Sequence, residues 1–333
     1  MKSILSWFVL IVSIAVLVSS CAKSDDSSTS STDNTTSSSD DSSSSSVPRG
    51  FVAVGNEGTI VKSTDNGSSF DNVTSPGGWD LGGVVFGNTT LVAVGQAGVV
   101  FSSTDNGSTW TKWMDWVNSS HFNGVTFGND IFVAVADDGI IIRSTNGSTW
   151  NNVTSLTANA NHIIGVTFGN NTFVAVGYSG NIVRSTDNGS SWDNATSPTG
   201  NHLRGVTFGN NTFVAVGASG NILRSTDNGS SFDNATSPTA NDLTGITFAN
   251  NTFVAVGDYI VRSTDNGSSF DNATSGTNHL VGANHLQGVG FGNNTFVAVG
   301  GSGTIVRSTD NGSNWDNATS PTGKKLYGVT FSE

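Results

Sequence analysis

The chain has 333 residues, of which 41 are glycine and only 11% are charged, and its formal net charge is −12. This acidic balance argues against a nucleic-acid partner, because phosphate binding needs clustered lysine and arginine. Good helix formers such as Leu, Lys, Met and Glu are scarce, so the composition favours short strands joined by tight turns. Cys21 is the single cysteine, which excludes an intrachain disulfide.

The first segment of the chain has the features of a secretory signal. An apolar run over residues 4–18 follows Lys2 and precedes small residues, and it is short for a membrane span. Val18-Ser19-Ser20-Cys21 resembles the lipobox of bacterial lipoproteins. That resemblance implies removal of residues 1–20, acylation of Cys21 and, with Ala22 next, sorting to the outer membrane. Ordinary signal cleavage beside an incidental cysteine is the alternative.

Residues 22–47 consist almost entirely of Ser, Thr, Asp and Asn. Such a segment buries too little apolar surface to offset its ordering entropy, so we expect residues 21–49 to form an acylated, disordered tether. A flexible coil of this length spans roughly 30 Å on average. Pro48-Arg49-Gly50 marks the start of the folded domain, which we place at residues 50–333.

From Phe51 onward the chain repeats itself about every 40 residues, which predicts the blades of a propeller. In residues 203–237 the unit reads as four strands: GVTF at 205–208, TFVAV at 212–216, NILRS at 221–225, and a fourth that starts near Phe232. Asn-Asn and Gly-x-x-Gly between them suit hairpin turns, which need positive φ. The run FVAV is apolar on both faces, as expected for a sheet between two neighbouring blades.

The repeat is out of phase with the ends of the domain. The domain begins with a second strand at Phe51–Val54 and ends with a first strand at Leu326–Phe331. We therefore expect Gly328–Phe331 to pair with Phe51–Val54 and complete the first blade, which removes two exposed sheet edges. The predicted fold is an all-β, seven-bladed propeller with four-stranded blades, closed by its C-terminal strand, and we expect it to be monomeric.

One motif recurs at the turn before each fourth strand. Its first copy, STDNGSSF at residues 63–70, resembles the Asp-box or BNR repeat of sialidases, some xyloglucan hydrolases, sortilin-type receptors and photosystem II assembly-factor propellers. The resemblance is specific for fold and nearly silent on function. It implies a structural Asp that accepts N–H groups and a Gly at positive φ. The third copy, residues 144–150, is one residue short and lacks Asp, so we expect a looser turn there. The structural aspartates are Asp65, Asp105, Asp187, Asp227, Asp265 and Asp310.

The loops that enter each first strand differ most between repeats, and we expect them to surround one mouth of the central channel. One position in them is polar in every copy. A histidine array could ligate a metal or respond to pH. We favour the alternative that each side chain caps the start of its own strand, repeated because the repeat was copied, and we predict neither metal nor cofactor. The residues are Asp80, His121, His162, His202, Asp242, His285 and Lys325.

Three tryptophans, Trp79, Trp113 and Trp116, belong neither to the Asp-boxes nor to the signal. Clustered tryptophan suits a sugar or a protein partner, and a small satellite core under a divergent loop is an equal alternative. The longer loop 277–287 is a second candidate surface. The remaining candidate ligand-binding residues are Tyr178, Arg204 and Tyr259.

Sialidase chemistry would need an arginine triad, a tyrosine nucleophile paired with a glutamate, and an acid. Five arginines and Lys62 share the position before the Asp-box, so in the domain only Arg204 lies off that register. Glu57 is the one glutamate that could pair with a tyrosine of the domain. We therefore predict no catalytic residue.

The expected function is a non-catalytic module for an envelope glycan or protein, held to the membrane by its lipid. The alternatives are an Asp-box glycoside hydrolase and an assembly-factor-like scaffold for an envelope complex.

Overall fold

The computed structural model describes residues 49–115, 120–153, 162–273 and 284–332. They belong to one of the two compact units of the chain, Ser46–Glu333. The predicted signal and lipidation site at Cys21, almost all of the tether, Trp116 and most of the loop 277–287 lie outside the described residues. Within the described ranges, no helix has the length and apolar character to cross a membrane.

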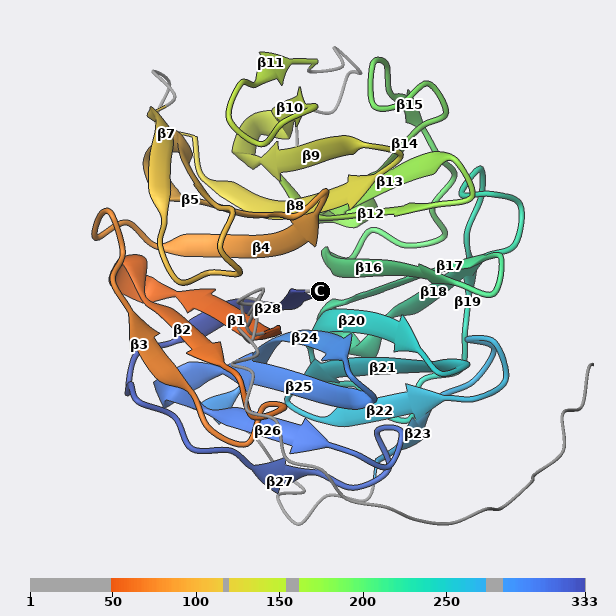
Figure 1. Ribbon diagram of the computed structural model, residues 1–333. Coiled ribbons are helices and arrows are strands. Elements are labelled where there is room, and N and C mark those ends of the chain that lie inside the picture. The colour runs from red at the N-terminus through yellow and green to blue at the C-terminus, as the bar shows by residue number, and fades with distance from the viewer. Residues whose placement is uncertain (1–48, 116–119, 154–161, 274–283, 333) are drawn as a thin grey trace, which may run out of the picture. The chain divides into compact units, whose positions relative to one another are not determined.

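Seven separate antiparallel sheets of four strands each surround a central axis, as predicted (Figure 1). The innermost strands are β28 (Leu326–Ser332), β4 (Leu81–Gly87), β8 (Phe122–Gly128), β12 (Ile163–Gly169), β16 (Leu203–Gly209), β20 (Leu243–Ala249) and β24 (Leu286–Gly292). The second strands are β1 (Gly50–Gly55), β5 (Thr90–Gly95), β9 (Ile131–Ala136), β13 (Thr172–Gly177), β17 (Thr212–Gly217), β21 (Thr252–Gly257) and β25 (Thr295–Gly300).

The outer half of each blade is shorter. Third strands are β2 (Ile60–Ser63), β6 (Val99–Ser103), β10 (Ile141–Ser144), β14 (Ile182–Ser185), β18 (Ile222–Ser225), β22 (Ile260–Ser263) and β26 (Ile305–Ser308). Fourth strands are β3 (Asp71–Val73), β7 (Thr111–Asp115), β11 (Asn151–Asn152), β15 (Asp193–Asn194), β19 (Asp233–Asn234), β23 (Asp271–Asn272) and β27 (Asp316–Asn317). Short 3₁₀ turns join second to third strands: η1 (Asn56–Gly58), η2 (Gln96–Gly98), η3 (Asp137–Gly139), η4 (Tyr178–Gly180), η5 (Ala218–Gly220) and η7 (Gly301–Gly303).

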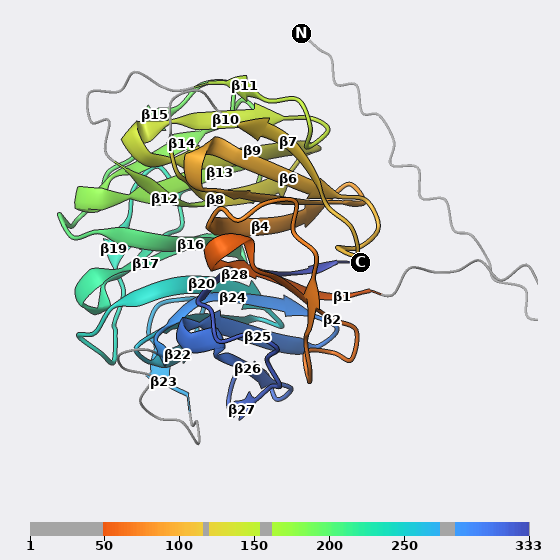
Figure 2. The ribbon, with the colours of Figure 1, turned by 90° about the vertical axis from the view of Figure 1, so that its left-hand side faces the viewer.

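The predicted ring closure is confirmed. Strand β28 pairs with β1 in the register Phe51↔Phe331 and Val54↔Gly328, and the two strands lie side by side in Figure 1 and Figure 2. The ring centroids of Phe51 and Phe331 are 5.0 Å apart. The Ser332 hydroxyl accepts the Gly50 N–H at 3.3 Å and donates to the Gly50 carbonyl at 3.1 Å.

The core lies between blades rather than inside any one of them. Each second strand is buried on both faces, so that Phe213, Val214, Ala215 and Val216 are all 0% exposed. Alternate side chains of the strand join the core clusters on opposite sides of the blade. The innermost strands of neighbouring blades approach closely, so that a Cβ on Gly328 would lie 3.2 Å from the Gly83 Cα in the second blade. Glycine suits this position because the neighbouring backbone lies close to where a side chain would begin.

Each Asp-box is a closed hydrogen-bonded turn. Asp65 Oδ1 accepts the N–H groups of Ser68 and Ser69 at 3.1 and 2.9 Å, and Gly67 has φ +77°. The expectation of a looser third turn is wrong. Asn146 Oδ1 accepts two N–H groups at 3.0 and 2.9 Å, because an amide oxygen replaces the carboxylate oxygen as acceptor.

The cations before the Asp-boxes join neighbouring blades. Lys62 Nζ donates to the Ser108 hydroxyl at 3.0 Å, and Arg143 donates to the Ser190 hydroxyl at 2.7 Å. Both acceptors lie in the Asp-box of the next blade. These side chains therefore point along the circumference of the ring and do not converge on a common site.

Candidate functional site

A cavity of about 490 Å³ opens where the innermost strands begin, at one mouth of the central channel. All seven blades contribute to it. Its lining residues are Asp80, Gly82, Gln96, His121, Phe122, Asn123, Ile164, Tyr178, Arg204, Thr244, Gln287 and Tyr327.

One position of the repeat supplies seven of these twelve residues. It is the second residue of the innermost strand, and the pairing register shifts at this residue in every blade, as at Arg204 between Leu203 and Gly205. A bulge of this kind re-aims a side chain. The residue before it is an apolar side chain at most 3% exposed, and the residue after it is always glycine. The residues are Gly82, Asn123, Ile164, Arg204, Thr244, Gln287 and Tyr327.

These seven residues are all different, although the repeats around them are nearly identical. We call them the mouth ring. Farther along the same strands, a smaller space of about 190 Å³ is lined by seven pairs of glycine and valine or isoleucine. The chain therefore varies its side chains at the mouth and keeps the channel behind it uniform and apolar.

The polar ring predicted from the sequence lies beside the mouth ring and performs a different task from the one expected. Asp80 Oδ1 accepts the Glu57 N–H at 2.7 Å, and Asp242 Oδ1 accepts the Ser219 N–H at 3.0 Å. Both donors lie in the 3₁₀ turn of the preceding blade. The expectation that each side chain caps its own strand is therefore wrong, because the N–H of the left-handed turn residue faces the neighbouring blade.

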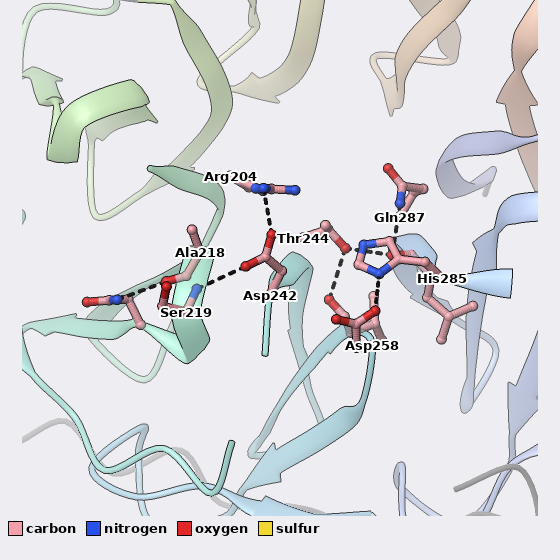
Figure 3. Close-up of polar contacts among 11 residues, drawn as sticks. Arg204, Ala218, Ser219, Asp242, Thr244, Asp258, His285 and Gln287 are labelled. Carbon is pink, nitrogen blue, oxygen red and sulfur yellow. Dashed lines mark hydrogen bonds and ion pairs between the residues drawn. The ribbon is translucent and has the colours of Figure 1, made fainter. Parts of the chain in front are cut away.

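Histidines also contact the turn of the preceding blade at other joints, through different partners. His202 Nδ1 accepts the Ser179 N–H at 3.0 Å. His285 Nδ1 lies 2.7 Å from Asp258 Oδ1, as Figure 3 shows, and His162 Nδ1 lies 2.9 Å from Asp137 Oδ1. His121 lines the cavity. Among the described residues, no group of three metal-ligating side chains gathers at one place.

Arg204 is the one cation of the mouth ring, and it is held in place. Its Nη2 lies 2.7 Å from Asp242 Oδ2, and each side chain is about one third exposed (33% and 36%). Figure 3 shows Asp242 between Arg204 and the Ser219 N–H, so that both carboxylate oxygens are engaged. The hydroxyl of Thr244 donates to the Leu286 carbonyl at 2.7 Å. This side of the mouth is therefore pre-organised.

The side of the mouth nearest the closing joint carries Lys325 and Tyr327. Lys325 Nζ lies 4.8 Å from the centre of the Tyr327 ring. Burial lowers the pKa of Lys325, and the charge of Arg204 lowers it further. Burial raises the pKa of Tyr327, and the charge of Asp80 raises it further. The Tyr327 phenol therefore keeps its proton at neutral pH and can donate a hydrogen bond.

Tyr178 is the exposed aromatic at the rim, with 38% of its surface accessible. Its ring stacks on His202 at 4.3 Å and 29°, and meets His162 edge-on at 5.2 Å. Tyr259, the other tyrosine predicted for a site, is half-buried against the core between two blades and does not line the cavity.

Trp79 and Trp113, the two tryptophans of the predicted binding cluster that the structure describes, do not line the cavity. Trp79 packs on the core between the first two blades, and Lys112 Nζ lies 3.7 Å from its ring centre. Trp113 is 51% exposed on the outer strand β7, where its indole N–H donates to the Ser102 hydroxyl. Trp79 is thus part of the packing between two blades, whereas Trp113 presents an exposed aromatic face on the outer edge.

A sialidase-like arrangement does not form among the described residues. Glu57 is 70% exposed and pairs with Lys324 at 2.9 Å. Lys62, Arg143, Arg184 and Arg224 bond to neighbouring blades. Arg204 is the single arginine among the residues that line the cavity. What the mouth offers is a guanidinium, a phenol, amides and aromatic faces, which together suit binding.

Comparisons with known proteins agree with this geometry. The family model for the photosynthesis system II assembly factor YCF48 matches residues 91–333. Among solved structures, YCF48 from Cyanidioschyzon merolae superposes with a TM-score of 0.60 at 20% identity, covering 77% of this chain and 90% of that one. A structure described as YCF48 bound to D1 peptide gives a TM-score of 0.57 at 17% identity, with coverage of 81% and 84%.

A computationally designed protein, Ika8, shares the fold with a TM-score of 0.55 at 15% identity, covering 83% of this chain and 92% of that one. No curated protein matches the chain significantly. Because the family model spans residues 91–333, well over half of the sequence, the chain belongs to the YCF48 family of BNR-type photosynthesis system II assembly factors.

Proposed function

We propose that the propeller is a non-catalytic scaffold that binds a peptide segment of a partner protein at the mouth ring. The observation that carries this proposal is the mouth ring itself. A position that holds seven different side chains in seven otherwise similar repeats is shaped for one asymmetric ligand, because a purely structural position would repeat its residue as its neighbours do.

The cavity suits a peptide in size and in chemistry. Its volume of about 490 Å³ falls within the range of ligand pockets. Arg204 and Tyr327 offer donors to main-chain carbonyls, and Tyr178 offers an aromatic face. Rigid aromatic and arginine side chains with a fixed geometry are the usual anchors of protein interfaces.

The comparisons support a protein ligand. A homologous propeller has been solved as YCF48 bound to D1 peptide, and the family model describes an assembly factor. At 17% identity the likeness to that complex shows the fold alone. On the basis of the family model, we propose for this chain an assembly-factor-like role with an envelope protein as partner.

We also propose that Cys21 carries a lipid anchor that holds the propeller at the bacterial envelope, at the outer membrane. The support is the lipobox-like sequence Val18-Ser19-Ser20-Cys21 and the polar segment that follows it. The lipid would supply the membrane affinity that a chain of net charge −12 lacks toward an anionic surface.

The test is selection of peptides from a random display library on the full chain, followed by calorimetry. We expect selected peptides to lose at least about tenfold in affinity on Arg204→Ala or Tyr327→Ala. Trp113→Ala, which removes an exposed aromatic on the outer edge, is the matched control and should bind as wild type. Peptides that bind all variants equally would place the site elsewhere.

The competing enzymatic function is tested with the same preparations. Sialyl and β-glucan chromogenic substrates should not be turned over. Turnover that disappears in Asp80→Asn, the carboxylate that lines the cavity, would replace the scaffold proposal with a glycoside hydrolase.

A further inference from the structure

The rim of the cavity contains a turn whose geometry depends on a histidine. Ser179, in η4, has the left-handed conformation φ +56°, ψ +33°, which costs energy for a non-glycine residue. Its N–H donates to His202 Nδ1 at 3.0 Å. The preceding residue, Tyr178, lines the cavity and stacks on the same imidazole at 4.3 Å.

Two other joints contain the same bond with a different acceptor. The left-handed residues Glu57 and Ser219 donate to the carboxylates of Asp80 and Asp242. A carboxylate accepts a hydrogen bond throughout the neutral pH range. A backbone N–H can only donate, so His202 makes this bond only while Nδ1 carries no proton. The joint at His202 is therefore the pH-sensitive version of a contact that the fold also builds with Asp.

Among the described groups that contact His202, none carries a negative charge that would offset a proton on its imidazole. The Tyr178 ring stacks on the imidazole, and His162, which pairs with Asp137, meets that ring edge-on. Its own strand β16 carries Arg204, whose charge is held by Asp242. Its main-chain carbonyl accepts the Ala218 N–H of η5, a turn without a charged residue. Within the described ranges, no carboxylate pairs with His202.

We propose that His202 is a positioning residue for Tyr178, which holds this aromatic face in the binding geometry when neutral and releases it when protonated. The predicted effect on ligand affinity rests on the proposed function. The predicted effect on the conformation of the Ser179 turn is independent of that function. A protonated His202 would present an N–H to the Ser179 N–H, which removes the bond and sets donor against donor. An imidazolium also attracts an aromatic face, and the lost bond together with the donor–donor contact opposes this attraction.

The first experiment needs no ligand. The amide resonance of Ser179 is followed in the full chain from pH 8 to pH 5, the range in which imidazoles titrate. We expect a sigmoidal shift in wild type and none in His202→Asp, which keeps an acceptor of the kind used at Asp80 and Asp242. His162 and His285 are present in both proteins, so any effect that they have on the resonance is common to the two. A Ser179 amide that does not move in wild type overturns the inference.

The second experiment measures affinity for a peptide selected as above. Wild type should bind about tenfold more weakly at pH 5.5 than at pH 8, a typical size for coupling between two sites. His202→Asp should lose that difference, and His202→Ala should bind weakly at both values. Equal pH dependence in wild type and His202→Asp would overturn the effect on binding. If the Ser179 amide resonance shifts with pH but the affinity of no selected peptide depends on Arg204, the proposed function fails and the pH-sensitive turn stands.

Discussion

The side-chain amide of Asn66, in the first Asp-box, donates a hydrogen bond of 2.6 Å to the hydroxyl of Thr295 in the seventh blade, 229 residues away. Three joints within the chain are built in the same way: Asn228 to Thr172, Asn266 to Thr212 and Asn311 to Thr252. In each pair the Asp-box asparagine reaches the second strand of the preceding blade. The joint between the seventh and first blades is therefore made with the same contact as these three joints.

Deletion of Lys325–Glu333 should open the ring at this joint. It removes strand β28 and leaves the edge of β1 unpaired. Leu326 and Val329 are at most 9% exposed, and each buried side chain of this kind contributes about 1.5–3 kcal/mol. We expect a loss of several kcal/mol, a large share of the 5–15 kcal/mol typical of a domain. Thermal unfolding followed by circular dichroism measures it.

The matched deletion removes residues 22–47, a longer segment of the predicted tether. Because we expect this segment to make no contact with the core, its deletion should leave the melting temperature of the propeller unchanged. Equal melting temperatures of the two deletion variants would contradict the assigned role of β28 in stability.

Cys21→Ser should release the protein from the membrane fraction without altering the melting temperature of the propeller. The reason is that the proposed anchor is a covalent lipid and the predicted tether separates it from the fold. Metabolic labelling with an alkyne-tagged fatty acid measures acylation and should mark the wild type alone. Labelling of the variant to the same extent would show that the lipid is attached elsewhere.

Truncation to alanine should destabilise the fold much more at Trp79 than at Trp113. Trp79→Ala removes a ring that packs on the core between the first two blades and that Lys112 covers. We expect it to destabilise the fold by about 2–4 kcal/mol, near the lower part of the range for buried aromatic residues. Trp113→Ala removes a side chain that is 51% exposed and should cost less than about 1 kcal/mol. Denaturant titration of both variants decides the comparison, and similar losses would contradict the distinction.

The fold could be predicted because every repeat carries several independent signals. FVAV indicates a strand covered on both faces, Asn-Asn and the Asp-box mark its turns, and the phase of the repeat at Phe51 and Phe331 predicts the closure that β1 and β28 form. These signals are local, and their recurrence from blade to blade reinforces them.

The site was harder to predict because it is marked by variation between the repeats at one position, and not by a residue type that the repeats share. The sequence draws attention to the histidines, which repeat, whereas the mouth ring includes Gly82 and Ile164, whose side chains have no distinctive chemistry. The bulge at the start of each inner strand decides which residue turns toward the axis, and a pattern of apolar residues does not reveal it. Aligning the repeats and looking for the position with the most variation would have identified the mouth ring.

The Asp-box carboxylates give the fold a defined dependence on acid. Partial burial of Asp227 opposes its ionisation, but the hydroxyl and N–H of Ser231, the Ser225 hydroxyl and the Ser230 N–H outweigh it and lower its pKa to about 2. Asp65, Asp187 and Asp265 are lowered to about 2 by the same kind of bonds. The pKa of each is thus lower in the folded chain than its ordinary value of 3.8.

It follows that these four carboxylates stabilise the propeller fully above about pH 4, the ordinary range of an aspartate, and that this contribution is lost as the pH falls toward 2. Asp227→Asn keeps an acceptor oxygen, like the one that Asn146 supplies in the third blade, but it cannot ionise. We expect it to cost about 0.5–2 kcal/mol at neutral pH, similar to the loss of a capping side chain, and to flatten the decline between pH 4 and pH 2. Urea unfolding across this pH range measures both effects. A variant as acid-sensitive as wild type would show that the Asp227 carboxylate does not drive the acid response.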